Sequence, residues 1–156
     1  MRRPFAITVA SVALLWAIQL RGQTPTTCTT PRDACQFFGT FLSALNHRDW
    51  DAFRATLDSG ITVMFDQPAP PERQDGRVAV EAIFRLIFPE AGSAPRPLPP
   101  PLVPENLKVQ SFGDVVVVSF HLRGLDNLAR RTLVLHHTTA GWRVVHIHGS
   151  SSRSSP

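Results

Sequence analysis

Histidine is the residue type in this chain best suited to acid–base chemistry, and it is concentrated near one end. Five of the six histidines lie in the last 36 residues. They are His121, His136, His137, His146 and His148. Because the pKa of histidine lies near neutrality, its ring can act as a general base or donate a hydrogen bond to a substrate oxygen. These residues are the first candidates for a functional site.

The spacing of His146 and His148 predicts that both lie on one face of a strand. Successive side chains of a strand point to opposite sides. Trp142 and Val144 are then expected on the same face as the two histidines, and Ile147 on the other. Four interpretations of the pair stay open. The histidines are pocket residues that move a proton or bind a substrate oxygen, metal ligands, structural groups that satisfy buried polar atoms, or residues of a dimer interface.

A metal site is the least complete of these interpretations. His146 and His148 supply two ligands, whereas catalytic zinc sites use three protein ligands. A third ligand would have to come from His121 or Asp66. We therefore assign no metal ligands and no cofactor to the chain.

Several other residues add chemistry to this candidate set. Asp66 ends a predicted strand beside a proline-rich loop, where it is either a pocket carboxylate or a turn residue. Arg130 and Arg131 begin another strand, so one of the two must point inward. An inward arginine suits a carboxylate or enolate oxygen, because its charged fork binds such oxygens in a bidentate manner. His121 on a valine-rich strand and Phe65 beside Asp66 are further candidates for substrate contact.

Several classes of function are disfavoured by the sequence. The chain has no Gly-x-Ser-x-Gly elbow, no glycine-rich phosphate loop and no His-Glu-x-x-His motif. Its net charge of +4 comes from 16 basic and 12 acidic residues, and three of the basic residues are Arg2, Arg3 and Arg21. The remainder is nearly neutral and has a single lysine, Lys108. A nucleic-acid partner is therefore not expected.

The N-terminal segment predicts export to the periplasm or the exterior. Two arginines precede an almost entirely apolar run over residues 5–20, as in a secretory signal peptide. We predict a signal peptide over 1–23 and a flexible leader over 24–30. The residues before the cleavage position are poor for cleavage, so an uncleaved membrane anchor is the alternative. Cys28 and Cys35 can pair in an oxidising compartment if Cys28 precedes the first helix.

Periodicity predicts an α+β domain over residues 31–149. Apolar residues at spacings of three and four indicate helices, and β-branched alternation indicates strands. The expected helices cover about 31–45, 49–57 and 78–88, and the strands 61–66, 107–112, 115–122, 131–138 and 142–148. Six prolines within 95–104 indicate a surface loop, and 150–156 a disordered tail. The helices are expected to pack on one face of a curved antiparallel sheet.

Three stretches resemble the SnoaL-like group of the NTF2-like superfamily. Residues 46–53 read Asn-His-Arg-Asp-Trp-Asp-Ala-Phe, and 75–83 begin with an Asp-Gly turn. The third stretch is similar to the closing strands of the family. It carries Arg131-Thr132 and then Trp142-x-Val-x-His-x-His-x-Ser.

The resemblance implies an NTF2-like (cystatin-like) cone of about three N-terminal helices, with a pocket between sheet and helices and usually a homodimer formed through the sheet. It places His146, His148, Trp142 and His121 on the concave face. Asp66 matches the position of a pocket carboxylate that moves a proton in isomerase- and cyclase-like members. The chain has no tyrosine, so the oxyanion arrangement of the steroid isomerases is absent.

Three hypotheses about function follow, and the sequence does not decide whether the chain is an enzyme. The first is an exported binding or accessory protein for a small apolar or carbonyl-containing molecule. The second is a cofactor-free isomerase, cyclase or dehydratase, in which Asp66 or a histidine moves a proton α to a carbonyl and Arg131 stabilises the oxyanion. The third is an interaction domain that assembles through its sheet. A membrane partner is expected only if the N-terminal segment is not cleaved.

Overall fold

The computed structural model describes residues 31–65, 73–85, 101–124 and 127–153. The predicted signal peptide, the leader, Asp66 and most of the proline-rich loop lie outside the described residues. Helices come first: α1 (Arg32–His47), α2 (Trp50–Thr56) and, after two strands, α3 (Arg77–Arg85). The strands are β1 (Leu57–Phe65), β2 (Arg73–Asp75), β3 (Glu105–Phe112), β4 (Val115–Arg123), β5 (Asn127–Thr138) and β6 (Gly141–Arg153).

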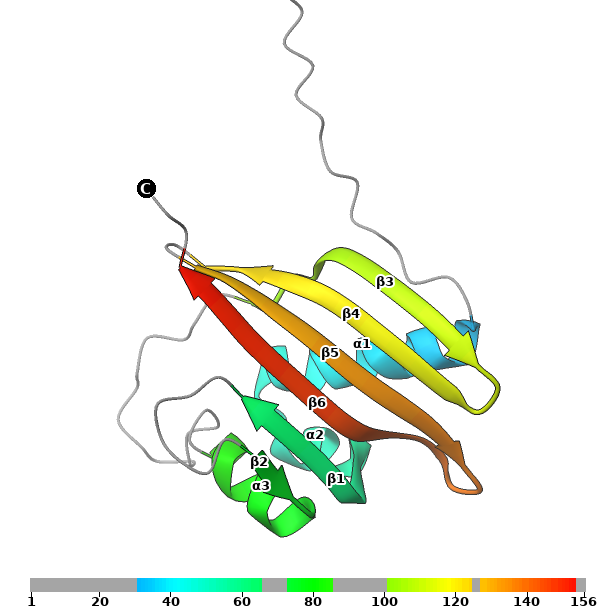
Figure 1. Cartoon of the computed structure of the whole chain (residues 1–156). Helices are drawn as coiled ribbons and strands as arrows, with labels where there is room; N and C mark the ends of the chain where they lie inside the picture. The colour runs from blue at the N-terminus through cyan, green and yellow to red at the C-terminus, as the bar shows by residue number, and fades with distance from the viewer. Residues whose placement is uncertain (1–30, 66–72, 86–100, 125–126, 154–156) are drawn as a thin grey trace, which may run out of the picture.

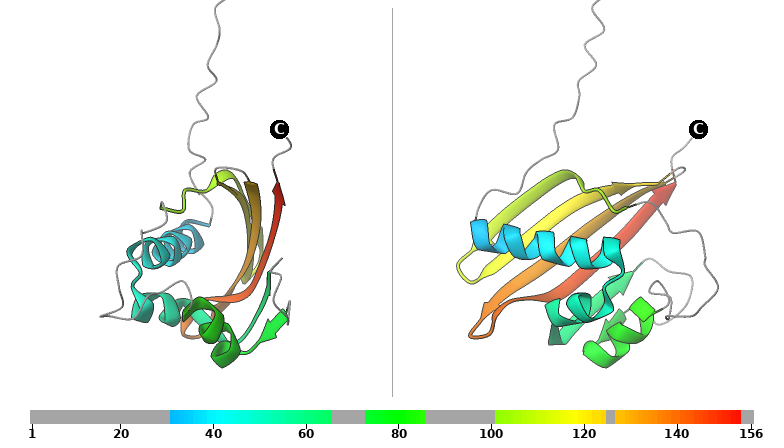
Figure 2. Two further views of the ribbon diagram at one scale, coloured as in Figure 1. Left: turned by 90° about the vertical axis from the view of Figure 1, so that its left-hand side faces the viewer. Right: turned by 180° about the vertical axis from the view of Figure 1, so that it is seen from behind.

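The six strands form one curved sheet in the order β2-β1-β6-β5-β4-β3. β1 pairs with β6 in parallel, and all other neighbours are antiparallel. The three helices lie on one side of this sheet, which leaves the convex side uncovered by described elements (Figures 1 and 2). The expected α+β cone is confirmed, with a mixed rather than purely antiparallel sheet.

Local sequence explains where the two N-terminal helices begin and end. Pro31 has extended dihedral angles and precedes α1, and Arg48 ends that helix in a left-handed conformation. Asp49 then caps α2, because its carboxylate accepts a hydrogen bond from the backbone N–H of Ala52 at 3.0 Å. The short Arg48-Asp49 link therefore turns the chain back so that α2 packs beside α1.

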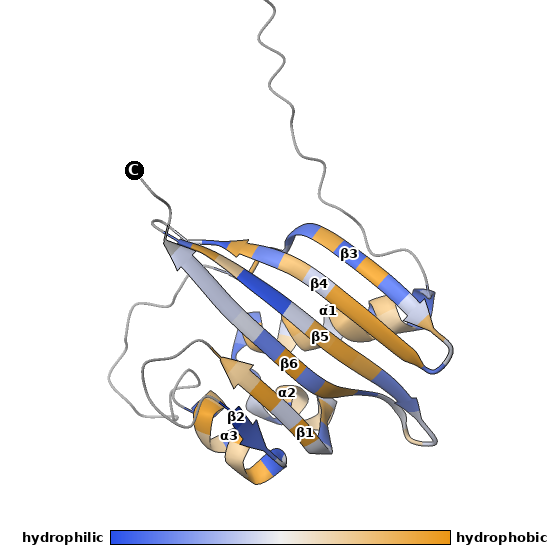
Figure 3. Ribbon diagram, in the orientation of Figure 1, coloured by the Kyte–Doolittle hydropathy of each residue, from blue (hydrophilic) through white to orange (hydrophobic). Residues whose placement is uncertain are grey.

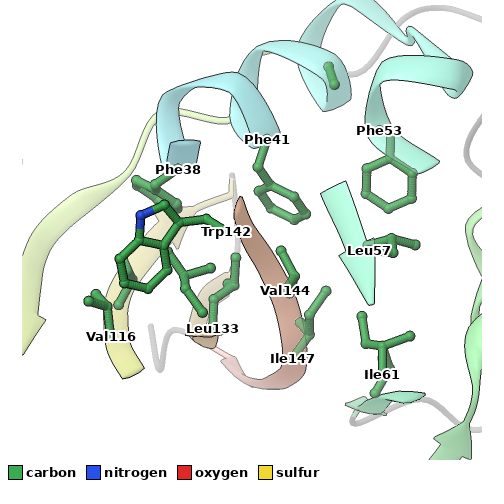
Figure 4. Close-up of a cluster of buried hydrophobic side chains, with 14 of the residues drawn as sticks. Phe38, Phe41, Phe53, Leu57, Ile61, Val116, Leu133, Trp142, Val144 and Ile147 are labelled. Carbon is green, nitrogen blue, oxygen red and sulfur yellow. The ribbon is translucent and has the colours of Figure 1, made fainter. Parts of the chain in front are cut away.

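The core lies between the helices and the concave face of the sheet. Phe53 of α2 is fully buried, and its ring lies 5.7 Å from the ring of Phe41 and 4.7 Å from that of Phe84. From the sheet, Leu57, Ile61, Leu133 and other aliphatic residues pack against these rings (Figure 4). In Figure 3, β4 and β5 are mostly hydrophobic over their middle, whereas the C-terminal half of β6 is hydrophilic.

Strands β5 and β6 extend well beyond their predicted limits. β5 begins at Asn127, and β6 continues to Arg153 instead of ending at His148. The register pairs Asn127 with Arg153, so each extension is the hydrogen-bonding partner of the other. Pairing of the backbone therefore overrides the serine-rich composition that indicated a disordered tail from residue 150.

Two further features bear on the N-terminal prediction. Cys35 is disulfide-bonded, and the other cysteine of the chain, Cys28, lies outside the described residues. Among the helices that the structure describes, none has the length and apolar character needed to cross a membrane.

Candidate functional site

A β-bulge in β6 decides which of its side chains face the helices. Leu135 of β5 pairs with Val144, but Val134, the preceding β5 residue, pairs with His146. Val145 is therefore an extra residue on β6 and shifts the alternation by one. As a result Ile147 is buried together with Val144, at 3% and 0% exposed. Ile147 thus takes the concave position that strict alternation gives to His146 or His148.

The prediction that His146 and His148 share the face of Trp142 is consequently wrong. Both histidines lie on the convex face, in register with Thr62 and Met64 of the neighbouring β1. Burial lowers the pKa of His146, and the nearby His148 lowers that pKa further. His146 therefore favours its neutral form, but neither ring contributes to the concave face.

His121 of β4 and His136 of β5 also lie on the convex face. Val118 and Phe120 of β4 are buried on the concave face, so His121 points to the convex side. The expectation that His121 lies on the concave face is therefore wrong. His136 also lies on the convex side, where its ring is 3.3 Å from the carboxylate of Asp114. Four of the six histidines thus share the convex face of the sheet, on the side away from the described helices.

Trp142 keeps its predicted concave position, but as a structural residue. Its side chain is 9% exposed, and its indole N–H donates a hydrogen bond to Asp33 of α1 at 2.9 Å. This hydrogen bond holds the pKa of Asp33 below its ordinary range. The ring of His137 lies edge-on to the indole at 4.9 Å. Trp142 therefore attaches the start of α1 to the β5–β6 hairpin.

Arg131 is the charged residue that the sheet turns inward. In register it pairs with the buried Phe120 on β4 and with Gly149 on β6, whereas Arg130 is exposed on the other face. Its guanidinium carbon lies 5.8 Å from the centre of the Phe65 ring. Burial lowers the pKa of Arg131, although an arginine stays charged at neutral pH. The expectation that one of the two arginines points inward is met by Arg131.

One edge of the Arg131 guanidinium is held by the backbone. Nη1 donates to the carbonyl oxygens of Arg130 at 2.8 Å and of Ser150 at 3.2 Å. Nε and Nη2 make no hydrogen bond to any described residue. Over the described ranges, the one fully buried side-chain nitrogen or oxygen without a partner is Nε of Arg77. The Nε and Nη2 edge of Arg131 is therefore within reach of solvent.

Gly149 makes room for this arrangement. A Cβ atom at Gly149 would lie 2.7 Å from the Phe65 ring and 3.0 Å from Nη1 of Arg131. The ring and the guanidinium thus occupy the space that any side chain at this position would need. Sequence reasoning did not single out Gly149, although an isolated glycine within a strand is itself a signal of close approach.

The structure brings together two of the predicted site residues, Phe65 and Arg131. Phe84 of α3 joins them, since its ring lies 5.9 Å from that of Phe65. Trp142, His121, His146 and His148 lie elsewhere, and Asp66 is outside the described residues. In the part of the chain that the structure describes, no group of three His, Cys, Asp or Glu side chains could hold a metal ion.

Three helices on the concave face of a curved six-stranded sheet form the α+β cone of the NTF2-like fold. Residues 35–154 match the SnoaL-like domain family. The chain therefore belongs to the SnoaL-like domain family, as the closing-strand motifs suggest. No curated protein matches the sequence.

Solved structures agree on the fold. A cystatin-like fold protein from Burkholderia xenovorans is 22% identical with a TM-score of 0.61, over 79% of this chain and 92% of that one. A protein from Streptomyces avermitilis, provisionally named a dehydratase of the NTF2-like family, is 19% identical with a TM-score of 0.57, over 80% and 95%. The CaMKII hub of S. rosetta is 20% identical with a TM-score of 0.57, over 80% and 98%. At these identities the likeness shows the fold alone.

Proposed function

We propose that this chain is an exported SnoaL-like protein that binds a small molecule on its concave face, in a binding or accessory role. The observation that carries the proposal is the environment of Arg131. A mostly apolar wall with one or two polar groups is the usual composition of a small-molecule site. The half-buried Phe65, backed by the buried Phe84 and Phe120, supplies the apolar part, and the free edge of Arg131 supplies the polar part.

Export is supported by two independent features. The first is the arrangement of basic and apolar residues at the N-terminus. The second is the disulfide bond of Cys35, since such bonds persist in oxidising compartments and are rare in the cytosol. Cleavage after about 20 residues would release the domain, whereas retention of the segment would anchor it.

Native mass spectrometry of the protein purified from the exported fraction tests both parts of this proposal. A denatured sample of the same preparation is the control. We expect a processed N-terminus and an additional organic mass that is lost on denaturation. A full-length chain in the cytosolic fraction would contradict export. A chain that carries no adduct and acquires none from the extract would contradict the binding role.

A cofactor-free isomerase, cyclase or dehydratase is the alternative function. Arg131 is then placed to stabilise a developing oxyanion, because its free edge faces solvent on the concave side. The group that moves the proton would be Asp66, since His146 and His148 lie on the opposite face. An Asp66→Asn variant distinguishes the two functions: it abolishes turnover of a bound ligand under the enzymatic alternative and leaves binding intact under the primary one.

A homodimer formed through the convex face is the second part of the proposal. This face is uncovered by the described helices and has half-buried valines, Val117 and Val134, near its centre. Such a dimer would bury them together with His146. Light scattering after gel filtration tests the proposal with Val134→Arg, which we expect to give a monomer. An Arg variant of Thr40, an exposed residue of α1 on the other side of the sheet, is the matched control. A wild-type monomer at all concentrations would contradict it.

A further inference from the structure

Arg131 has no acidic partner among the described residues, whereas three other arginines of the sheet and helices have one. Arg54, Arg73 and Arg123 form ion pairs with Glu81, Asp75 and Glu105 at 2.6 to 3.0 Å. All three of these arginines are more than half exposed, so their charges would be hydrated even without a partner. Arg131 is half-buried, and within the described residues no carboxylate lies within ion-pairing distance of it.

Removing a charge from water is costly unless an opposite charge or hydrogen bonds replace the solvent. Burial lowers the pKa of Arg131, the direction expected when loss of solvent disfavours the charged form. Two carbonyl oxygens compensate only Nη1. The remaining three N–H groups, on Nε and Nη2, have no acceptor among the described residues and are open to solvent or a ligand.

The geometry of the free edge selects the acceptor. Parallel N–H bonds from Nε and Nη2 match the two oxygens of a carboxylate, in a bidentate pair that a single carbonyl oxygen cannot form. The Nη1 contacts fix the orientation of the guanidinium plane, so this edge is ordered before any ligand arrives. Preorganisation of this kind favours binding, because less side-chain freedom is lost on association.

The surroundings of the guanidinium limit the rest of the ligand. Phe65 lies beside it, Phe84 packs against Phe65, and Phe120 is its cross-strand neighbour. Leu122 and Ala129 continue the concave face towards the end of the sheet. A ligand with several charges would have to desolvate the others against these apolar groups. A single carboxylate on an apolar or aromatic body fits both features.

We propose that the concave site binds organic monocarboxylates, with the carboxylate paired to the Nε and Nη2 edge of Arg131 and an apolar or aromatic body against the half-buried Phe65. This inference rests on the proposed small-molecule function and names the chemical class of its ligand. It also gives Gly149 a role, since the missing side chain lets Phe65 and Arg131 approach each other closely enough to contact one ligand.

Paired probes that differ only in the head group test the inference. Saturation-transfer NMR and calorimetry at pH 7.5 would compare 4-phenylbutanoate with its neutral amide, 4-phenylbutanamide. We expect the carboxylate to bind at least about tenfold more tightly, since hydrogen bonds to charged groups are the stronger class. Arg131→Gln should remove this preference, and Arg131→Lys should retain part of it because the charge stays while the bidentate geometry is lost.

Arg130→Gln is the matched control. It also removes one positive charge, but from the exposed residue next to Arg131, one whose side chain lies on the convex face. This variant should leave the affinities for both probes within about twofold of those of the wild type, because the charge it removes is solvated and lies on the opposite face of β5. Circular dichroism and the urea midpoint of each variant show whether it is folded. Gly149→Ala, which introduces the Cβ contacts described above, should weaken both probes.

The outcomes separate the inference from the function on which it rests. Equal binding of acid and amide, unchanged in Arg131→Gln, would leave a small-molecule site in place and overturn the carboxylate assignment. An equal loss in Arg130→Gln and Arg131→Gln would overturn it as well, because a general field and not a paired edge would then hold the anion. Absence of binding by both probes, and by a wider set of apolar acids and amides, would overturn the proposed function itself.

Discussion

Because of the bulge at Val145, we predict that the same substitution has different effects on stability at Ile147 and at the adjacent His148 of β6. Strict alternation would bury His148 and expose Ile147, whereas the structure buries Ile147 at 3% exposed and leaves His148 exposed. Thr is a good strand residue, so replacing each in turn by Thr tests burial without changing strand propensity. Ile147→Thr should destabilise the domain and His148→Thr should not.

The magnitude follows from burial. Ile147→Thr removes two buried carbon groups, about 1.5 kcal/mol at roughly 0.8 kcal/mol each. It also places a hydroxyl among apolar residues, which costs about 1–3 kcal/mol if no acceptor is found. The sum is about 2.5–4.5 kcal/mol, whereas an exposed substitution such as His148→Thr changes stability by about 0.5 kcal/mol or less.

Urea unfolding followed by tryptophan fluorescence measures both variants. With a slope of about 2 kcal/mol per molar urea, the expected loss lowers the midpoint of Ile147→Thr by about 1–2 M. The midpoint of His148→Thr should move by about 0.25 M or less on the same slope. A larger loss in His148→Thr than in Ile147→Thr would refute the face assignment of β6 and restore the histidines to the concave side.

Three further predictions concern single contacts. Asp49→Ala removes the cap of α2 and should lower stability by about 1 kcal/mol, measured by urea unfolding; an unchanged midpoint would contradict the role of the cap. Trp142→Phe removes the indole N–H, so the pKa of Asp33 should return towards its ordinary range in an NMR titration; a pKa that stays low would assign the shift to another cause. Because the folded-state pKa of His146 is lowered, stability should fall as the pH drops through the ordinary histidine range. His148→Gln should raise the pKa of His146, and a pH profile unchanged by His146→Gln would contradict its part in this loss.

Much of the fold was predictable because its signals are local. The apolar stripe of α1, the Asp49 cap and the valine-rich β4 each depend on residues within one turn or one strand. The β2 strand was not predicted, since Arg73, Gln74 and Asp75 have no apolar alternation and form a strand only because β1 supplies a partner. The extension of β6 to Arg153 has the same origin.

The candidate site was predictable only in part, because it depends on register. The sequence shows that either Arg130 or Arg131 must point inward. The pairing of Arg131 with Phe120 and Gly149 shows that it is Arg131. The histidine pair was misplaced because Val145 looks like an ordinary strand residue. A valine gives no signal that it is the extra residue of a bulge. Once that extra residue is missed, every later residue of β6 is assigned to the wrong face of the sheet.

The position of β6 has a consequence for the order in which the chain can fold. β6 is the last described strand in the sequence, yet it lies in the interior of the sheet between β1 and β5. Until residues 141–153 leave the ribosome, the β1–β2 pair and the β3–β5 sheet have no shared strand, and each presents an open edge. Closure of the sheet must therefore wait until β6 has been made. An exported chain that crosses a membrane unfolded would gain from this delay, because its sheet cannot close while that strand is still being made.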